Sequence, residues 1–363
     1  MQIERRIRIA AVSLALASLL SAACGDNGAR PAAYSNGIHV DTLQKWSAYA
    51  SSSDEGLWAD DPSRRIRVER VDTYGGAEDL SPPFFKADFI AAFGDTIYIA
   101  DGSQEALIAM SSAGELLWTA GRLGEGPGDF AMIGSVSRCD DVIAVCNNAN
   151  SRLDFFGTDG TYRSSIAVSG PQNVIMLSDS TGLVASKSQP GGDVHCFSVD
   201  SGIQRSIGER EWELFPNNYP RRDLFIAYHP MGRVACVSQF QDALRIYDLE
   251  TGETVHSGTR NIPAIPTGGT VEVFYTVYAT IFTGPEGMIN VPIPNLMNNG
   301  EFMGSGGSRH TPVTIVDRYN WDGVYLDSYL LPDSVLGSIV YTAKLGFIAA
   351  QWGTSEIHRY ELL

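Results

Sequence analysis

A tight-turn signature that recurs along the chain constrains the fold more than any other feature. The turns end in glycine at the following positions: Gly114, Gly160, Gly202, Gly252 and Gly323. Each turn lies between two β-prone runs, such as residues 153–156 or 244–249. This arrangement is typical of a hairpin whose glycine adopts the left-handed conformation. The glycines lie 46, 42, 50 and 71 residues apart, and the last interval falls to 53 without the 18 Gly-, Asn- and Ser-rich residues 293–310.

This spacing predicts the fold class. A period of about 40–50 residues with four strands per unit is typical of a β-propeller. The innermost strand of each unit is expected near residues 88–93, 131–138, 173–178, 224–229, 272–282 and 335–341. We therefore predict an all-β domain over residues 66–363: a six-bladed β-propeller with four-stranded antiparallel blades.

The last blade needs a strand from elsewhere in the sequence. Its third strand, residues 356–362, is the last β-prone run of the sequence. Residues 66–71 form a β-prone run before the first blade and have no hairpin partner of their own. We expect this N-terminal strand to complete the last blade and close the ring, because closure removes an unpaired edge.

The N-terminal segment has the pattern of an export signal. Three arginines precede an uncharged run over residues 9–20, and Ser21-Ala22-Ala23 then leads into Cys24. We predict a lipoprotein-type signal peptide over residues 1–23 and lipidation of Cys24, with plain cleavage and secretion as the alternative. Residues 24–65 are expected to be a tether with room for one short strand. Because Gly25 follows the cysteine, the predicted location is the bacterial cell envelope, at the outer membrane, on a side that is left open.

The net charge excludes one class of partner. The full chain carries −16, and residues 1–23 contain three Arg and one Glu, so the mature chain carries −18. A polyanionic surface repels phosphate backbones, so we expect no nucleic-acid partner. No later segment has the run of about 18 apolar residues that a spanning helix needs, so membrane contact is expected through the lipid anchor only.

Four cysteines remain in the mature chain: Cys139, Cys146, Cys196 and Cys236. Their even number in an oxidising compartment permits disulfides, and a role as small buried strand residues is the alternative. None forms a C-x-x-C motif or stands at metal-ligand spacing from a histidine, so no zinc site is expected.

One stretch carries a resemblance to a known group of proteins. Residues 121–130 read G-R-L-G-E-G-P-G-D-F and follow the β-prone run 95–101. This stretch resembles the six-bladed β-propeller lipoproteins of the NHL-like and TolB-like group. The resemblance supports the fold, but it leaves function open, because such propellers range from binding platforms to lactonases and lyases.

The long connections predict where a partner binds. Segments 121–130, 208–223, 258–271 and 293–310 all fall on one face if the strands follow propeller order, and long loops on a rigid scaffold often carry function. The candidate contact residues are aromatic or basic: Arg122, Trp212, Tyr219, Arg221 and Arg222. We expect a monomeric binding module for a protein, peptide or glycan. The alternatives are that Trp212 folds back as a lid and that the glycine-rich loop is only a tight crossing anchored by Phe130.

The rival hypothesis is a calcium-dependent lactonase-like hydrolase. Oxygen ligands at the starts of several inner strands would suit Ca²⁺ at the channel mouth: Asp129, Asn173, Asp223 and Glu272. Asp and Asn are also frequent in turns for structural reasons. No motif pairs a nucleophile with its base, and the six histidines are scattered. We therefore expect no catalytic residues and no cofactor.

Overall fold

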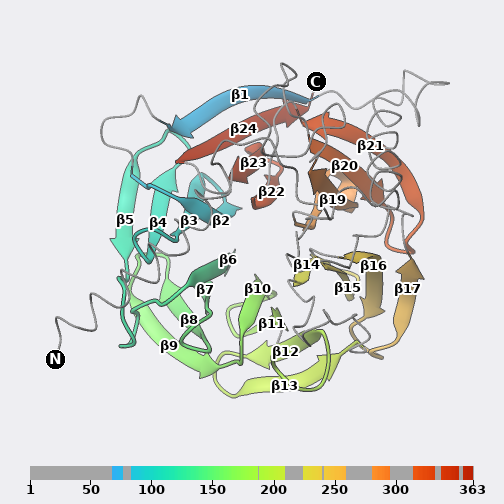
Figure 1. The fold of residues 1–363 in the computed structure, drawn as a ribbon, viewed down its shortest axis with the longest axis horizontal. Helices are drawn as coiled ribbons and strands as arrows, with labels where there is room; N and C mark the ends of the chain where they lie inside the picture. The colour runs from blue at the N-terminus through green and yellow to red at the C-terminus, as the bar shows by residue number, and fades with distance from the viewer. Residues whose placement is uncertain are drawn as a thin grey trace, which may run out of the picture.

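The chain folds into a ring of six four-stranded sheets (Figure 1). The computed structural model describes residues 68–76, 83–186, 188–208, 224–238, 241–258, 280–294, 314–331, 337–350 and 355–362. Each sheet is antiparallel, and in each the strands lie in order from the innermost to the outermost. The predicted fold class, a six-bladed β-propeller, is confirmed.

The blades are numbered along the chain, each from its innermost strand outward. Blade 1 contains β2 (Ala87–Phe93), β3 (Thr96–Asp101), β4 (Ala106–Ser111) and β5 (Leu116–Ala120). Blade 2 contains β6 (Ile133–Cys139), β7 (Val142–Asn147), β8 (Arg152–Gly157) and β9 (Tyr162–Ala167). Blade 3 contains β10 (Pro171–Met176), β11 (Thr181–Ser186), β12 (Val194–Ser198) and β13 (Gly202–Ile207).

The second half of the ring follows the same plan. Blade 4 contains β14 (Leu224–His229), β15 (Arg233–Ser238), β16 (Gln241–Asp248) and β17 (Thr254–Gly258). Blade 5 contains β18 (Phe282–Thr283), β19 (Ile289–Pro294), β20 (Thr314–Tyr319) and β21 (Tyr325–Leu331). Blade 6 contains β22 (Ile339–Thr342), β23 (Gly346–Ala350), β24 (Glu356–Leu362) and β1 (Val68–Gly75).

The N-terminal strand closes the ring, as predicted. β1 pairs antiparallel with β24, so the first and last described strands lie side by side in blade 6 (Figure 1). The register shifts between Arg70 and Asp72, which leaves Val71 in a bulge. Most of β1 is exposed, and Tyr74 near its end is its buried anchor.

The core consists of six apolar clusters, one in each seam between neighbouring blades. In the seam between blades 1 and 2, for example, Tyr98 and Leu107 pack against Phe130 and Phe156. The seams form because each twisted blade has two apolar faces, and each face is buried against the next blade.

A second contact recurs at the outer edge of the seams. The carbonyl oxygen two residues before the turn glycine accepts a hydrogen bond from a side chain of the preceding blade. Among the described residues the cases are Tyr74 Oη to Ser112 O (2.9 Å), Trp118 Nε1 to Thr158 O (2.9 Å), Arg205 Nη1 to Glu250 O (2.8 Å) and Arg233 Nη1 to Trp321 O (2.7 Å). We call each of these contacts an outer clamp. The acceptor position repeats with the turn, while the donor side chain differs from seam to seam.

The four cysteines are free thiols in the structure. Burial raises the pKa of the Cys146 and Cys236 thiols, so both stay protonated at neutral pH. Cys146 and Cys236 are therefore small buried strand residues, whereas Cys139 and Cys196 are half-buried. No helix in the described part of the chain has the length and apolarity to cross a bilayer.

Candidate binding face

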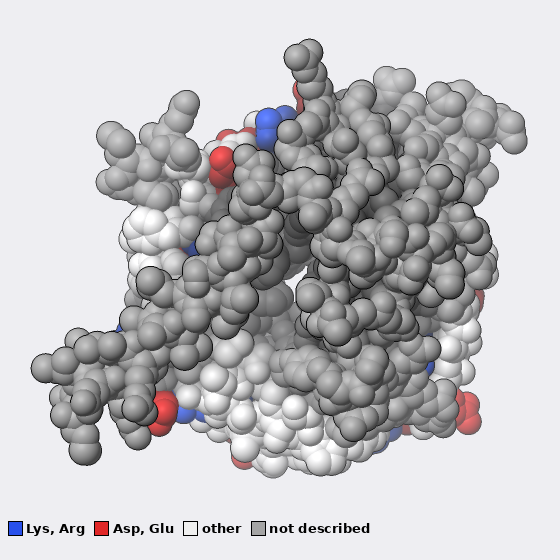
Figure 2. All heavy atoms as spheres, in the orientation of Figure 1, with Lys and Arg blue, Asp and Glu red and all other residues white. Residues whose placement is uncertain are grey.

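The chain order places two kinds of connection on one face of the ring: those between the second and third strands of a blade, and those that lead from one blade to the next. The turns between the first and second strands and between the third and fourth strands lie on the other face. Of the four long segments on the first face, the described residues include all of 121–130 but only the ends of the other three, at Gly208, Gly258 and Ile293–Pro294. Several predicted residues lie outside the described part: Cys24, Trp212, Tyr219, Arg221, Arg222, Asp223 and Glu272. In the space-filling view, the visible charged side chains lie around the circumference of the ring (Figure 2).

The glycine-rich loop, residues 121–130, doubles back on itself. Gly124 N–H donates to Phe130 O (2.9 Å), and Phe130 N–H donates to Arg122 O (2.8 Å). The Phe130 ring is fully buried and packs against Phe156, with ring centroids 5.6 Å apart. Gly121 has φ +81°, and a Cβ there would lie 2.3 Å from the Phe130 ring, so this position requires glycine.

Two side chains of blade 2 hold the outer part of this loop. Asn150 Nδ2 donates to Gly124 O (2.9 Å). Arg152 donates from Nη1 to Glu125 O (3.0 Å) and from Nη2 to Gly126 O (2.6 Å) and Asp129 O (2.8 Å). The other side of the guanidinium group contacts the buried Asp154 carboxylate at 2.9 Å. Because this group satisfies three loop carbonyls at once, the loop is fixed before any partner arrives.

The loop presents an arginine and a leucine to solvent. The Arg122 side chain is 82% exposed and contacts Asp129 Oδ1 through Nε at 3.1 Å. Leu123, directly after it, is 73% exposed. Arg122 is therefore exposed on this loop, and its role as a contact residue stays a prediction. Leu123 was not among the predicted contact residues.

Two further apolar side chains are exposed where the chain enters the innermost strands of blades 1 and 2. Phe85 is 59% exposed and stands two residues before β2, while Met132 is 62% exposed and stands directly before β6. β2 and β6 are the neighbouring innermost strands of blades 1 and 2. We call Phe85, Leu123 and Met132 the apolar patch.

The turn between β3 and β4 of blade 1 holds the two segments that lead into β2 and β6. Phe85 N–H donates to Asp101 Oδ2 (2.7 Å), and Ile133 N–H donates to Glu105 Oε2 (2.8 Å). Glu105 and Met132 both have left-handed backbone, with φ +51° and +57°. Such conformations are costly for residues other than glycine and cluster at functional sites.

The acids below the patch have opposite pKa shifts. Burial raises the pKa of Asp88, and the neighbouring Lys86 ammonium, 3.0 Å away, offsets this only in part. Burial would also raise the pKa of Asp101, but its hydrogen bonds from Phe85, Ser103 and Gln104 outweigh this and lower it. Asp101 therefore stays ionised and fixes the turn.

The two described candidates for calcium ligands have structural partners. Asn173 donates from Nδ2 to Ser135 Oγ (3.0 Å) in blade 2 and accepts from Ile226 N–H (3.0 Å) in blade 4, so it links three inner strands. The Asp129 carboxylate lies within its own loop, against Arg122 and the glycines at 124 and 126. Within the described residues, no group of three or more His, Cys, Asp or Glu is placed to hold a metal ion.

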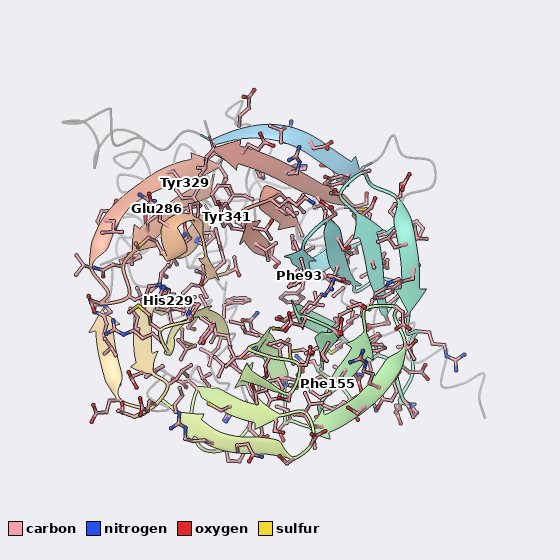
Figure 3. All side chains as sticks on the ribbon, turned by 180° about the vertical axis from the view of Figure 1, so that it is seen from behind. Phe93, Phe155, His229, Glu286, Tyr329 and Tyr341 are labelled. Atoms are coloured by element: carbon pink, nitrogen blue, oxygen red, sulfur yellow. The ribbon has the colours of Figure 1, made fainter. Side chains whose placement is uncertain are left out.

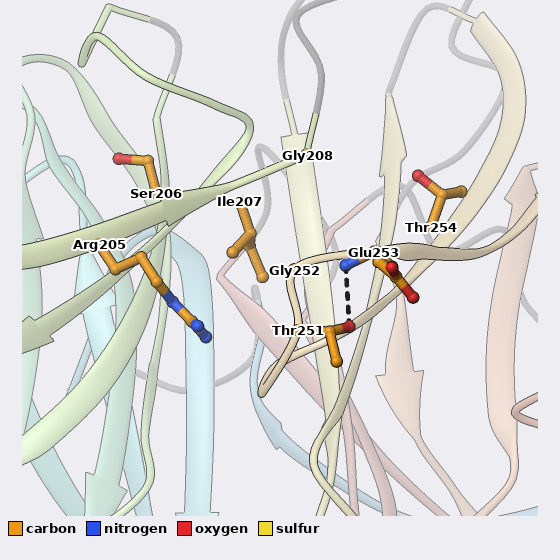
Figure 4. Close-up of a pocket in the computed structure, with 8 residues that line it drawn as sticks. All are labelled: Arg205, Ser206, Ile207, Gly208, Thr251, Gly252, Glu253 and Thr254. Atoms are coloured by element: carbon orange, nitrogen blue, oxygen red, sulfur yellow. Dashed lines mark hydrogen bonds between the residues drawn. The ribbon is translucent and has the colours of Figure 1, made fainter.

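A separate groove lies between blades 3 and 4 (Figure 4). Its volume is about 490 Å³, and one wall is formed by Arg205–Gly208 and the other by Thr251–Thr254. Ile207 is its buried apolar residue, and the other lining side chains are polar or charged. The close-up shows Ser206 pointing away from the opposite wall (Figure 4).

The inner strands also carry partly exposed aromatic groups. Figure 3 shows Phe93 and His229, the last residues of β2 and β14, together with Tyr341 of β22. The Arg138 guanidinium stacks on the Phe93 ring at 4.3 Å from the centroid and contacts the Tyr98 hydroxyl. His229 packs on Trp321, with ring centroids 5.1 Å apart. These contacts pair the groups with one another across seams.

The fold defines the class of the protein, a six-bladed β-propeller, and solved structures share it. A member of the DUF4221 family from Bacteroides vulgatus is 9% identical with a TM-score of 0.53, covering 82% of this chain and 99% of that chain. A Bacteroides fragilis protein named as exported is 13% identical with a TM-score of 0.52, covering 82% and 95%. Virginiamycin B lyase from Staphylococcus aureus is 11% identical with a TM-score of 0.50, covering 82% and 100%.

No known family profile and no curated protein matches the sequence. At these identities the structural likeness shows the fold alone.

Proposed function

We propose that this protein is an exported binding module that recognises a protein partner through the face that carries the long loops. The observation that carries the proposal is the pre-organised loop 121–130. Arg152 and Asn150 donate hydrogen bonds to four of its carbonyl groups, while Arg122 and Leu123 remain exposed. A pre-organised loop loses little conformational entropy on binding. The rest of the contact is assigned to Trp212, Tyr219, Arg221 and Arg222, residue types common in binding hot spots.

The proposal includes a place in the cell and a subgroup. The signal-like residues 1–23 and Cys24 support a lipid-anchored protein of the cell envelope, at the outer membrane. The resemblance of residues 121–130 supports membership of the NHL-like and TolB-like lipoproteins. The structural likeness to an exported Bacteroides fragilis protein is consistent with export. Replacing Cys24 with Ser should move the protein from the membrane to the soluble fraction, and an unchanged distribution would exclude the lipid anchor.

Site-specific photo-cross-linking tests the binding face. A photoreactive amino acid at Leu123 should give a defined adduct in living cells. The same amino acid at Leu117, which is 51% exposed on the outer strand β5, should give none. Both positions carry an exposed leucine in the wild type, so the comparison separates specific contact at the long-loop face from non-specific cross-linking. Equal labelling from both positions, or labelling from Leu117 alone, would contradict the proposal.

A calcium titration tests the rival hydrolase. A metal that binds the folded state only raises the melting temperature, and a chelator reverses the gain. We expect no calcium-dependent shift and no lactonase turnover. A shift that is abolished by Asp223→Ala would replace the binding-module proposal with the enzyme.

A further inference from the structure

The apolar patch lies among more carboxylates than cations. The acids around it are Asp88, Asp101, Glu105, Glu125 and Asp129, and the cations are Lys86, Arg122 and Arg152. Lys86 contacts Asp88 at 3.0 Å, Arg122 contacts Asp129 at 3.1 Å and Arg152 contacts the buried Asp154 at 2.9 Å, so all three cations are already paired. Glu105 and Glu125 have no basic partner among the described residues. The patch is therefore locally acidic, on a chain whose net charge is −16.

The backbone of Met132 supports a role for its exposed side chain. Its φ of +57° is a conformation that Gly or Asn adopts at lower cost. The hydrogen bonds of Ile133 and Asn148 hold the neighbouring backbone, so the fold maintains this conformation. A strained residue that presents a thioether to solvent contributes nothing to the core, whereas methionine is common at adaptable binding surfaces.

From these observations we propose that the apolar patch binds an extended basic segment of the partner, with Lys or Arg side chains alternating with apolar ones. The apolar side chains contact Phe85, Leu123 and Met132, and the basic ones face Glu105 and Glu125. In an extended chain successive side chains point to opposite sides, so one segment meets both kinds of group. This inference rests on the proposed function and names the chemistry of the partner at that site.

Three labelled octapeptides test the inference by fluorescence anisotropy with the intact protein. The first alternates Leu with Lys, the second alternates Leu with Glu, and the third alternates Ser with Lys. We expect binding of the Leu/Lys peptide only, because it alone combines burial with charge complementarity. Raising the salt from about 50 to 500 mM should weaken it several-fold, since exposed charges are screened.

Matched variants locate the site. Leu123→Ser and Met132→Asn should each weaken the Leu/Lys peptide by about tenfold, the effect of losing one buried apolar side chain. Asparagine tolerates the left-handed backbone, so Met132→Asn should leave the melting temperature unchanged. Glu125→Gln should weaken binding by about threefold through lost charge. Leu117→Ser on the outer strand and Glu253→Gln on the opposite face are the controls, and neither should change binding.

The outcomes separate this inference from the proposed function. Equal binding of the Ser/Lys peptide would show attraction to a polyanion alone and would overturn the inference. Preference for the Leu/Glu peptide, or loss of binding in the two controls, would overturn it as well. In each case a cross-link from Leu123 would still support the binding module. The opposite result is also informative. If Leu123 gives no cross-link but the Leu/Lys peptide binds at the patch, the proposed protein partner is excluded, while the inferred preference of the patch for basic and apolar side chains stands.

Discussion

The two seams on either side of blade 2 are built differently at their outer edges. Between blades 1 and 2, the Trp118 indole lies over Gly160 and donates to Thr158 O at 2.9 Å. Between blades 2 and 3, no described residue other than the chain neighbours of Gly202 has an atom within 4 Å of the position that a Cβ would take at Gly202. The described contacts of this seam are the apolar cluster and inner hydrogen bonds, such as that of Ser135 Oγ with Asn173.

One side chain explains the difference. Trp118 pairs with Ala109 in blade 1, and Ser164 pairs with Phe155 at the same register in blade 2. Serine is too short to reach the next blade, so the outer clamp is missing there. The comparison teaches that the apolar cluster and inner hydrogen bonds suffice to join two blades, while the outer clamp is an added contact. The apolar patch lies at the seam that has both.

Removing the clamp should have the largest effect. Trp118→Ala deletes a half-buried indole and its hydrogen bond, and we expect a loss of about 2–3 kcal/mol in the free energy of unfolding. Urea denaturation followed by circular dichroism measures it. Trp118→Phe keeps an aromatic ring but lacks the N–H donor, so it should lose about 1 kcal/mol. A Trp118→Ala loss below that of Trp118→Phe would show that the clamp contributes nothing.

A glycine pair should isolate the contact from backbone strain. Gly160 and Gly202 have similar left-handed φ, +81° and +77°, so alanine costs a similar amount of strain at both, about 1 kcal/mol. At Gly160 the new Cβ would lie 2.8 Å from the Trp118 ring, whereas at Gly202 it meets open space among the described residues. Gly160→Ala should therefore lower the urea midpoint more than Gly202→Ala. Equal losses would mean that Trp118 moves aside freely and is not a clamp.

The sequence predicted the ring because its turns repeat. The glycines of the tight turns mark the period, and the β-prone run at 66–71 revealed the closing strand, which the structure has at Val68–Gly75. The outer clamps left no such signal, because the repeated part is a backbone carbonyl and the donors are Tyr, Trp and Arg. Sequence reasoning could not separate Phe85, Leu123 and Met132 from core residues, since exposure is set by tertiary contacts. The hydrogen bond from Arg152 to Gly126 O likewise joins residues that are 26 positions apart, a contact that only the tertiary structure creates.

Acid should destabilise the blade 1 side of this seam through Asp101. The second strands of blades 1, 2 and 3 end in the buried polar residues Asp101, Asn147 and Ser186, of which only Asp101 ionises. Its pKa is lowered in the folded state, so its stabilising effect is complete above the unfolded value of about 3.9 and is lost as pH falls through the folded pKa. Asp101→Asn should therefore lower the melting temperature at pH 7, and the difference from wild type should shrink below about pH 4. A difference that stays constant down to pH 2 would contradict the assignment.

The smallest expected effect is a gain at the unclamped seam. Ser164→Trp places an indole at the register that Trp118 occupies one blade earlier, above Gly202 and beside the carbonyl of Asp200. If the missing side chain is the reason the clamp is absent, the new ring should cover Gly202 and its N–H should donate to Asp200 O. We expect a gain of up to about 1 kcal/mol, because one hydrogen bond and a half-buried ring are partly offset by lost side-chain freedom. Ser165→Trp, at the neighbouring exposed position, is the control and should give no gain. A lower urea midpoint for Ser164→Trp alone would show that the blades at this seam are spaced too widely or too closely for a clamp, and that blade geometry, not the side chain, distinguishes the two seams.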